Sequence, residues 1–209
     1  MNIIELQNIT YAYPGGHALF MNLNFAQQRN SRTALTGPNG AGKSTLLMLI
    51  MGLLKPESGT IALWEKKMAS EEDFREARRK TGFLFQDPDH QLLCPSVEED
   101  IAFTLLNRDI KPDAAKEKVH AICDELSITH LLGRVPFHLS RGEKKLVALA
   151  GALVSNPELL LLDEPTDSLS PEMTDALITL LKGYQGTMLI ATHDHALIEQ
   201  LCTDRRDVF

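Results

Sequence analysis

A glycine-rich loop at residues 37–44 restricts the possible folds of this 209-residue chain more than any other feature. Glycines of this spacing let the backbone curl so that several N–H groups point inward, and a following helix presents its positive N-terminal end to the same point. The pattern GxxxxGKS therefore predicts a phosphate-binding loop between a strand and a helix. Its members are Gly37, Pro38, Asn39, Gly40, Ala41, Gly42, Lys43 and Ser44.

Three side chains at the end of this loop have separate expected tasks. Lys43 is expected to reach the β- and γ-phosphates of a nucleotide, and Ser44 is expected to ligate Mg²⁺. Thr45 stands where its hydroxyl or N–H could meet the α-phosphate. A chance match in a glycine loop is the alternative, but the motif lies between an expected strand and an expected helix, as the mechanism requires.

Strands alternate with helices after a β-rich start, which indicates an α/β fold on a largely parallel sheet. Residues 3–13 and 19–25 are expected to pair as antiparallel strands around the turn at residues 14–16. Residues 159–162 are four consecutive leucines, the pattern of a fully buried parallel strand. The other expected strands are residues 32–36, 60–64, 82–85 and 187–192, and the expected helices are residues 43–53, 71–80, 97–106, 113–126 and 140–154.

The chain is expected to form a single domain over residues 1–209, because this length supports one substantial core but not two full-sized ones. The character of the sequence changes after Gln86, where an acidic loop that contains proline is followed by two helical patterns. We interpret residues 87–145 as a helical subdomain that is inserted into the sheet domain.

Two carboxylates follow the leucine run directly. Asp163 and Glu164 would lie at the carboxyl end of a buried strand, where ligands of parallel sheets usually bind. Asp163 is expected to hold Mg²⁺ through water, and Glu164 to orient or deprotonate an attacking water. The alternative is that they are two solvated acids at the start of a loop. The presence of the phosphate loop favours the functional interpretation over this one.

Four further segments, in order, make the chain resemble the ATP-binding cassette (ABC) family. Residues 139–143, LSRGE, resemble the family's signature loop LSGGQ or LSGGE at the start of a helix. Gln86 follows a short expected strand, as the family's Q-loop glutamine does, and His193 follows the strand at residues 187–192, as its switch histidine does. Tyr13 is similar to the aromatic residue that stacks on adenine.

Each of these residues also has a simpler interpretation. Ser140 and Gly142 could serve only to cap a helix, because serine is common at that position. His193 could be an ordinary loop histidine, and Tyr13 a strand aromatic that faces the core. Their joint order and spacing favour the resemblance.

The resemblance implies a P-loop NTPase fold and a head-to-tail pair of cassettes, with each ATP between the phosphate loop of one chain and the signature helix of the other. Ser140, Gly142 and Glu143 would then contact the ATP of the partner chain. Gln86 would sense the γ-phosphate and Mg²⁺. The expected catalytic set is Lys43, Gln86, Glu164 and His193, with ATP and Mg²⁺ as cofactors.

The resemblance also implies partners and a location. The second cassette would be another copy of the chain or a different chain, and integral membrane subunits would carry the transport path. Residues 85–92, FQDPDHQL, are similar to a stretch in cassettes of the cobalt/nickel and energy-coupling-factor import group. We therefore expect a peripheral protein on the cytoplasmic face that powers import of a metal ion or vitamin.

Three positions depart from the family pattern. Arg141 replaces the first glycine of the signature pair, where its side chain could contact phosphate or ribose or turn to solvent. Ser170 stands where the D-loop usually has aspartate, and Leu146 where the signature helix commonly has arginine. These three departures lie in segments that would join the two cassettes. They are therefore expected to affect the coupling between the two subunits more than the binding of nucleotide.

The net charge and the motifs help to choose between the alternative functions of the chain. The net charge of −7 argues against a nonspecific nucleic-acid partner, which would require an excess of Lys and Arg. A soluble cassette that remodels nucleic acid or protein complexes is the main alternative, and a small P-loop kinase is a weaker one. The kinase would leave the signature-like loop and His193 unexplained.

Overall fold

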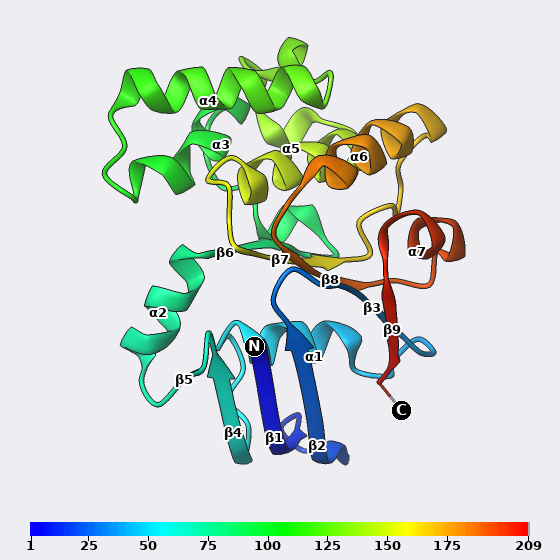
Figure 1. Cartoon of the computed structure of the whole chain (residues 1–209). Coiled ribbons are helices and arrows are strands. Elements are labelled where there is room, and N and C mark those ends of the chain that lie inside the picture. The colour runs from blue at the N-terminus through cyan, green and yellow to red at the C-terminus, as the bar shows by residue number, and fades with distance from the viewer. Residues whose placement is uncertain (209) are drawn as a thin grey trace.

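The computed structural model describes residues 1–208, which form a parallel sheet, an antiparallel sheet and surrounding helices (Figure 1). The five-stranded parallel sheet has the order β6-β7-β8-β3-β9, and the four-stranded antiparallel sheet has the order β2-β1-β4-β5. The strands are β1 (Asn2–Ala12), β2 (Ala18–Gln28), β3 (Arg32–Thr36), β4 (Ser58–Leu63), β5 (Lys66–Lys67), β6 (Thr81–Leu84), β7 (Leu159–Asp163), β8 (Thr187–Ala191) and β9 (Asp204–Asp207).

Most helices begin at a residue whose side chain caps the first turn. Ser70, Ser96, Ser140, Ser170 and Asp194 each accept a hydrogen bond from a backbone N–H that no helical carbonyl can satisfy. These local caps fix where the helices start. The helices are α1 (Lys43–Ile50), α2 (Glu71–Arg79), α3 (Val97–Leu106), α4 (Pro112–Glu125), α5 (Arg141–Leu153), α6 (Pro171–Gly183) and α7 (His195–Leu201).

The parallel sheet separates two apolar cores. In β7, Leu160 and Leu162 pack into one core while Leu159 and Leu161 pack into the other, because alternate residues of a strand face opposite sides. One core contains the buried faces of α3 to α7, and the second contains α1 and the antiparallel sheet. Figure 1 shows these helices and the antiparallel sheet on opposite sides of β6, β7 and β8.

The predicted fold class is confirmed, with differences in detail. α6, α7 and the short β5 are additional to the predicted elements. α1 ends at Ile50 rather than near residue 53, because Gly52 has a φ of 69° and breaks the helical path. The predicted boundary near residue 145 falls inside α5, whose buried face shares a core with α3 and α4. The division into a subdomain at residues 87–145 remains a prediction.

The parallel strands bring distant segments of the chain to one edge of the sheet. The phosphate loop follows β3, Gln86 follows β6, Asp163 ends β7 and His193 follows β8. Since the carboxyl ends of parallel strands meet at the same edge, this topology assembles the side chains that the sequence separates by more than 150 residues.

Candidate functional site

The phosphate loop has the backbone conformation that its glycines allow. Gly37, Gly40 and Gly42 have φ values of 138°, 82° and 96°, all in the region that favours glycine. Gly42 is the N-cap of α1, and no side chain caps this helix. The first-turn N–H groups of α1 are therefore available to an anion, and no acidic residue lies in that turn.

Lys43 brings a positive charge to the base of this loop. Its side chain is largely buried, and Nζ donates to the carbonyl oxygens of Gly37, at 2.9 Å, and Pro38, at 3.2 Å. The lysine thus spans the loop that precedes it. A cation held here can attract a phosphate and stabilise the loop at the same time.

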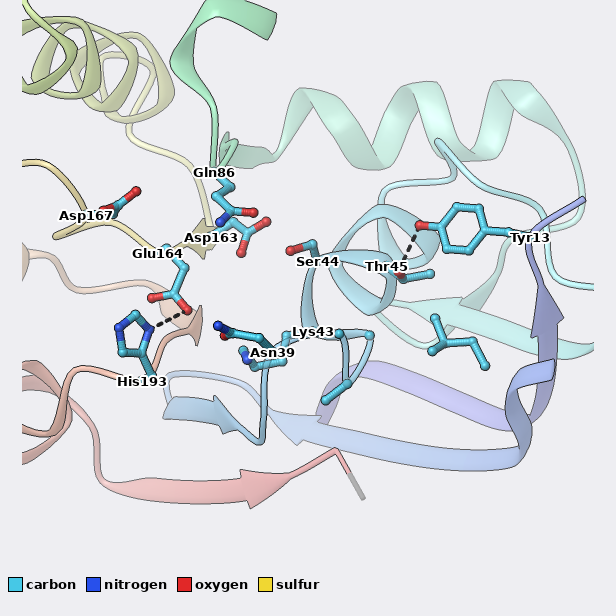
Figure 2. A pocket seen from close by; sticks show the side chains of 14 residues that line it. Tyr13, Asn39, Lys43, Ser44, Thr45, Gln86, Asp163, Glu164, Asp167 and His193 are labelled. Atoms are coloured by element: carbon cyan, nitrogen blue, oxygen red, sulfur yellow. Dashed lines mark hydrogen bonds and ion pairs between the residues drawn. The ribbon is translucent and has the colours of Figure 1, made fainter. Parts of the chain in front are cut away.

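One cavity of about 670 Å³ joins the loop to the other strand ends (Figure 2). This volume is in the range of small-molecule binding sites. Most of the site residues predicted from the sequence line this cavity, although Gly37 and Pro38 lie just before its lining. The lining residues are Tyr13, Leu19, Asn39, Gly40, Ala41, Gly42, Lys43, Ser44, Thr45, Gln86, Asp163, Glu164, Asp167 and His193.

Asp163 is the most deeply buried carboxylate in the cavity. Its exposed fraction is 4%, and its Oδ1 has no hydrogen-bond partner in the described protein. Burial raises the pKa of Asp163, and a hydrogen bond with the Ser44 side chain opposes that rise. A buried carboxylate oxygen without a partner is the kind of group that a cation would satisfy.

Glu164 has an unusual backbone conformation, and two residues that follow β8 bind its carboxylate. Its φ is 44°, a left-handed value that is costly for a residue with a side chain. Thr192 Oγ1 donates to Glu164 Oε2 at 3.0 Å, and His193 Nδ1 lies 3.0 Å from Oε1. Both carboxylate oxygens are thereby oriented. Hydrogen bonding and the charge of Glu164 raise the pKa of His193.

Tyr13 and Gln86 lie at two different walls of the cavity. Tyr13 is 44% exposed, and its hydroxyl forms a hydrogen bond with Thr45 Oγ1 at 2.9 Å. The ring of Tyr11 packs edge-on against it. Figure 2 shows Gln86 beside Asp163, near the carboxylates, and Tyr13 at the far end. An aromatic face and a polar carboxylate-rich end are thus separated by the phosphate loop.

The signature-loop residues form a separate group at the start of α5. Ser140 and Glu143 make a capping box, with Ser140 N donating to Glu143 Oε2 at 2.8 Å and Glu143 N donating to Ser140 Oγ at 3.3 Å. The Ser140 hydroxyl also donates to Glu143 Oε2, at 2.7 Å, and this bond together with the one from Ser140 N lowers the pKa of Glu143. Ser140, Gly142 and Glu143 are not among the residues that line the cavity of their own chain.

Some residues of the site were not predicted from the sequence. Asp167 lines the cavity and forms an ion pair with Arg141 at 3.5 Å. Arg141 therefore contacts a carboxylate of its own chain, an outcome that the sequence comparison with the family did not suggest. Thr192 orients Glu164, and its position directly before His193 is the only sequence signal that could have indicated this role.

No group of three or more His, Cys, Asp or Glu side chains within residues 1–208 is arranged to hold a metal ion. In the same part of the chain, no helix combines the length and the apolar character that crossing a membrane requires.

The fold and the cavity define a P-loop nucleotide-binding protein with a mainly parallel sheet, an added antiparallel sheet and helices on the opposite side. The family described as ABC transporter matches residues 20–167, and the chain belongs to this family.

Relatives and solved structures agree with this assignment. The energy-coupling factor transporter ATP-binding protein EcfA of Methanothermobacter thermautotrophicus is 40% identical over 202 residues, which cover 95% of this chain and 65% of the relative. Curated relatives of this kind are covered over 49% to 84% of their lengths. This chain therefore spans only part of them.

Two solved structures share the fold over almost the whole chain. CbiO1 of Clostridium perfringens, part of the ABC transporter complex CbiONQ, has a TM-score of 0.83 and 35% identity, covering 99% of this chain and 84% of that one. The ATP-binding cassette MJ0796, solved as a dimer bound to ADP and phosphate, has a TM-score of 0.86 and 25% identity, covering 94% and 90%.

Proposed function

We propose that the chain is the ATP-binding and ATP-hydrolysing subunit of an ABC transporter. The observation that carries this proposal is the single cavity in which the phosphate loop, Gln86, Asp163, Glu164 and His193 meet from separate strand ends. Phosphoryl transfer depends on positioning and charge stabilisation, and this set contains groups for both. Membership of the ABC transporter family and the names of the relatives support the same function.

The residues that would bind the phosphates and the residue that would bind adenine lie at different ends of the cavity. The N–H groups of the phosphate loop and the Lys43 ammonium would hold the β- and γ-phosphates, and Thr45 would meet the α-phosphate. Tyr13, which is partly exposed at the other end, would stack on adenine through its ring. The distribution of charge and aromatic surface in the cavity fits a nucleotide in this orientation.

Hydrolysis needs a group that accepts a proton from water. Water attacks the γ-phosphorus, a new P–O bond forms, and the bond between that phosphorus and the β–γ bridging oxygen breaks, which leaves ADP. Glu164 would take the proton from the water, since its carboxylate is buried and already oriented by Thr192 and His193. His193 would keep this carboxylate directed at the cavity.

Mg²⁺ fits the oxygen donors of the site. The Ser44 hydroxyl, the Asp163 carboxylate with its unpartnered Oδ1 and the Gln86 amide would hold the ion, together with phosphate oxygens. When bound, Mg²⁺ would neutralise charge on the β- and γ-phosphates.

The position of the signature-loop residues supports a second cassette chain as partner. Ser140, Gly142 and Glu143 lie outside the cavity of their own chain, so in a head-to-tail pair they would contact the nucleotide of the other chain. A dimer is known for the similar cassette MJ0796. ATP would join the two chains, and hydrolysis would release them.

The other partners would be integral membrane subunits, with this chain on the cytoplasmic face of the membrane. The relatives named as energy-coupling factor transporter proteins, and CbiO1 as part of the ABC transporter complex CbiONQ, support a transporter subunit. Import of a metal ion or vitamin rests on the resemblance of residues 85–92 to the cobalt/nickel and energy-coupling-factor import group. The choice of cargo would lie in the membrane subunits rather than in this chain.

Phosphate release from ATP and Mg²⁺ by the purified chain tests the proposed activity. Lys43→Ala should abolish ATP binding, because the loop loses its cation, whereas His193→Ala should bind ATP and lose turnover. Release of phosphate without an acceptor also separates this function from a P-loop kinase. A chain that binds ATP but transfers phosphate only to an added acceptor would contradict the proposal, and unaltered hydrolysis by His193→Ala would remove His193 from it.

A further inference from the structure

Lys145 is the most deeply buried charged side chain within the described residues. Its exposed fraction is 0%, whereas its neighbour Lys144 keeps some exposure and pairs with Asp89. Lys145 Nζ instead donates to the carbonyl oxygens of Gln86, at 2.6 Å, and Phe85, at 3.3 Å. No carboxylate in residues 1–208 lies within ion-pair distance of this ammonium.

A buried ammonium is unfavourable unless hydrogen bonds replace its hydration. Burial lowers the pKa of Lys145, while the charges of Asp167 and Asp163 oppose that change. The two carbonyl oxygens of residues 85 and 86 are therefore the groups that compensate the buried cation. In return, the ammonium fixes the main chain of the segment that carries Gln86.

Two other side chains tie the same segment to α5. Gln91 accepts a hydrogen bond from Phe85 N at 3.3 Å and donates to Ala148 O at 2.9 Å. Lys144 Nζ lies 2.6 Å from Asp89 Oδ1. Residues 85–91 are thus attached to α5 between Lys144 and Ala148. Lys145 is the attachment nearest to the cavity, because it binds the main chain of Gln86 itself.

In the proposed function, these contacts link the start of α5, which would face the nucleotide of the second chain, to the cavity that would bind the nucleotide of this chain. The first turn of α5 carries Ser140, Gly142 and Glu143, which would face the nucleotide of the second chain. Gln86 lines the cavity of its own chain. We propose that Lys145 is a positioning residue, which holds Gln86 in the nucleotide cavity and couples its position to that of α5. This inference rests on the proposed function for its catalytic consequence.

Hydrogen exchange of the full chain tests the attachment without any assay of activity. In Lys145→Met, which keeps the length of the side chain but has no donor, amides in residues 84–92 should exchange about tenfold faster or more. Amides of residues 36–46 should be unchanged. The matched control is Leu153→Ala, which alters a buried side chain at the other end of α5 and should leave residues 84–92 protected. Equal exchange in Lys145→Met and the wild type would overturn the proposal.

A double-mutant cycle on ATP hydrolysis tests whether Lys145 acts through Gln86. Lys145→Met should lower kcat about tenfold and change KM by less than about threefold, while Leu153→Ala should leave kcat unchanged. In a Gln86→Ala background the same lysine substitution should have no further effect on kcat. Independent effects that multiply in the double variant would overturn the inference. If the wild type hydrolyses no ATP, the proposed function fails, and hydrogen exchange still decides the attachment.

Discussion

His193 Nδ1 lies 3.0 Å from Glu164 Oε1, although the two residues follow different strands and are 29 positions apart. The strands β7 and β8 are neighbours in the parallel sheet, so their carboxyl ends place the imidazole against the carboxylate. This pair connects the candidate general base to an imidazole, whose charge can change with pH.

The pair predicts a raised pKa for His193. Hydrogen bonding to Glu164 favours the charged imidazole, so its pKa should lie above the ordinary value of about 6.5. The stabilisation from the pair is fully present below the unfolded pKa and is lost as the pH rises through the folded one. An NMR titration of the ring measures this shift. Glu164→Gln should return the pKa toward about 6.5, and an unchanged value would contradict the role of the carboxylate.

Replacement of the candidate base should separate ATP binding from hydrolysis. Glu164→Gln keeps the size of the side chain but cannot accept a proton, so we expect hydrolysis to fall by about 10² to 10⁴ while ATP binding persists. Two chains should then remain associated in the presence of ATP and Mg²⁺. Sedimentation velocity measures this association. A chain that remains monomeric at high concentration would rule out pairing with itself and leave a different cassette as partner.

Two glycines of α5 should respond in opposite directions to alanine. A Cβ on Gly142 would lie 2.9 Å from Ser168 O and 3.1 Å from Met173 Sδ, so Gly142→Ala should destabilise the fold by about 1–3 kcal/mol. A Cβ on Gly151 would meet no atom closer than 3.9 Å. Gly151→Ala should therefore stabilise the helix by about 0.5–1 kcal/mol. Urea denaturation compares both variants with the wild type, and equal shifts would show that the packing around Gly142 adapts.

The ion pair between Arg141 and Asp167 should be weak. Their atoms are 3.5 Å apart, and about half of each side chain is exposed, with side-chain values of 55% and 43%. Exposed pairs of this kind contribute about 0–1 kcal/mol. A double-mutant cycle with Arg141→Gly and Asp167→Asn should yield a coupling energy in that range, which falls further at high salt. A salt-independent coupling above that range would indicate a stronger constraint on the signature loop.

Much of the fold could be predicted because its signals are local. The predicted strand at residues 32–36 coincides with β3, and the predicted helix at residues 97–106 coincides with α3. A strand between two cores is apolar on both faces, which is why the leucines of β7 were recognisable. α6 is different, since its buried face of Leu177, Ile178 and Leu181 is short and lies within a mixed sequence.

The sequence by itself determined the phosphate loop, because the left-handed backbone of its glycines and the helix that follows are properties of neighbouring residues. The sequence also showed that Asp163, Glu164 and His193 each come directly after or at the end of an expected strand. Only the tertiary structure decided that Lys145 is buried against the main chain of Gln86 and that Arg141 meets Asp167. Burial and ion pairing join residues that are distant in sequence, and no local pattern specifies which of two adjacent lysines loses its contact with water.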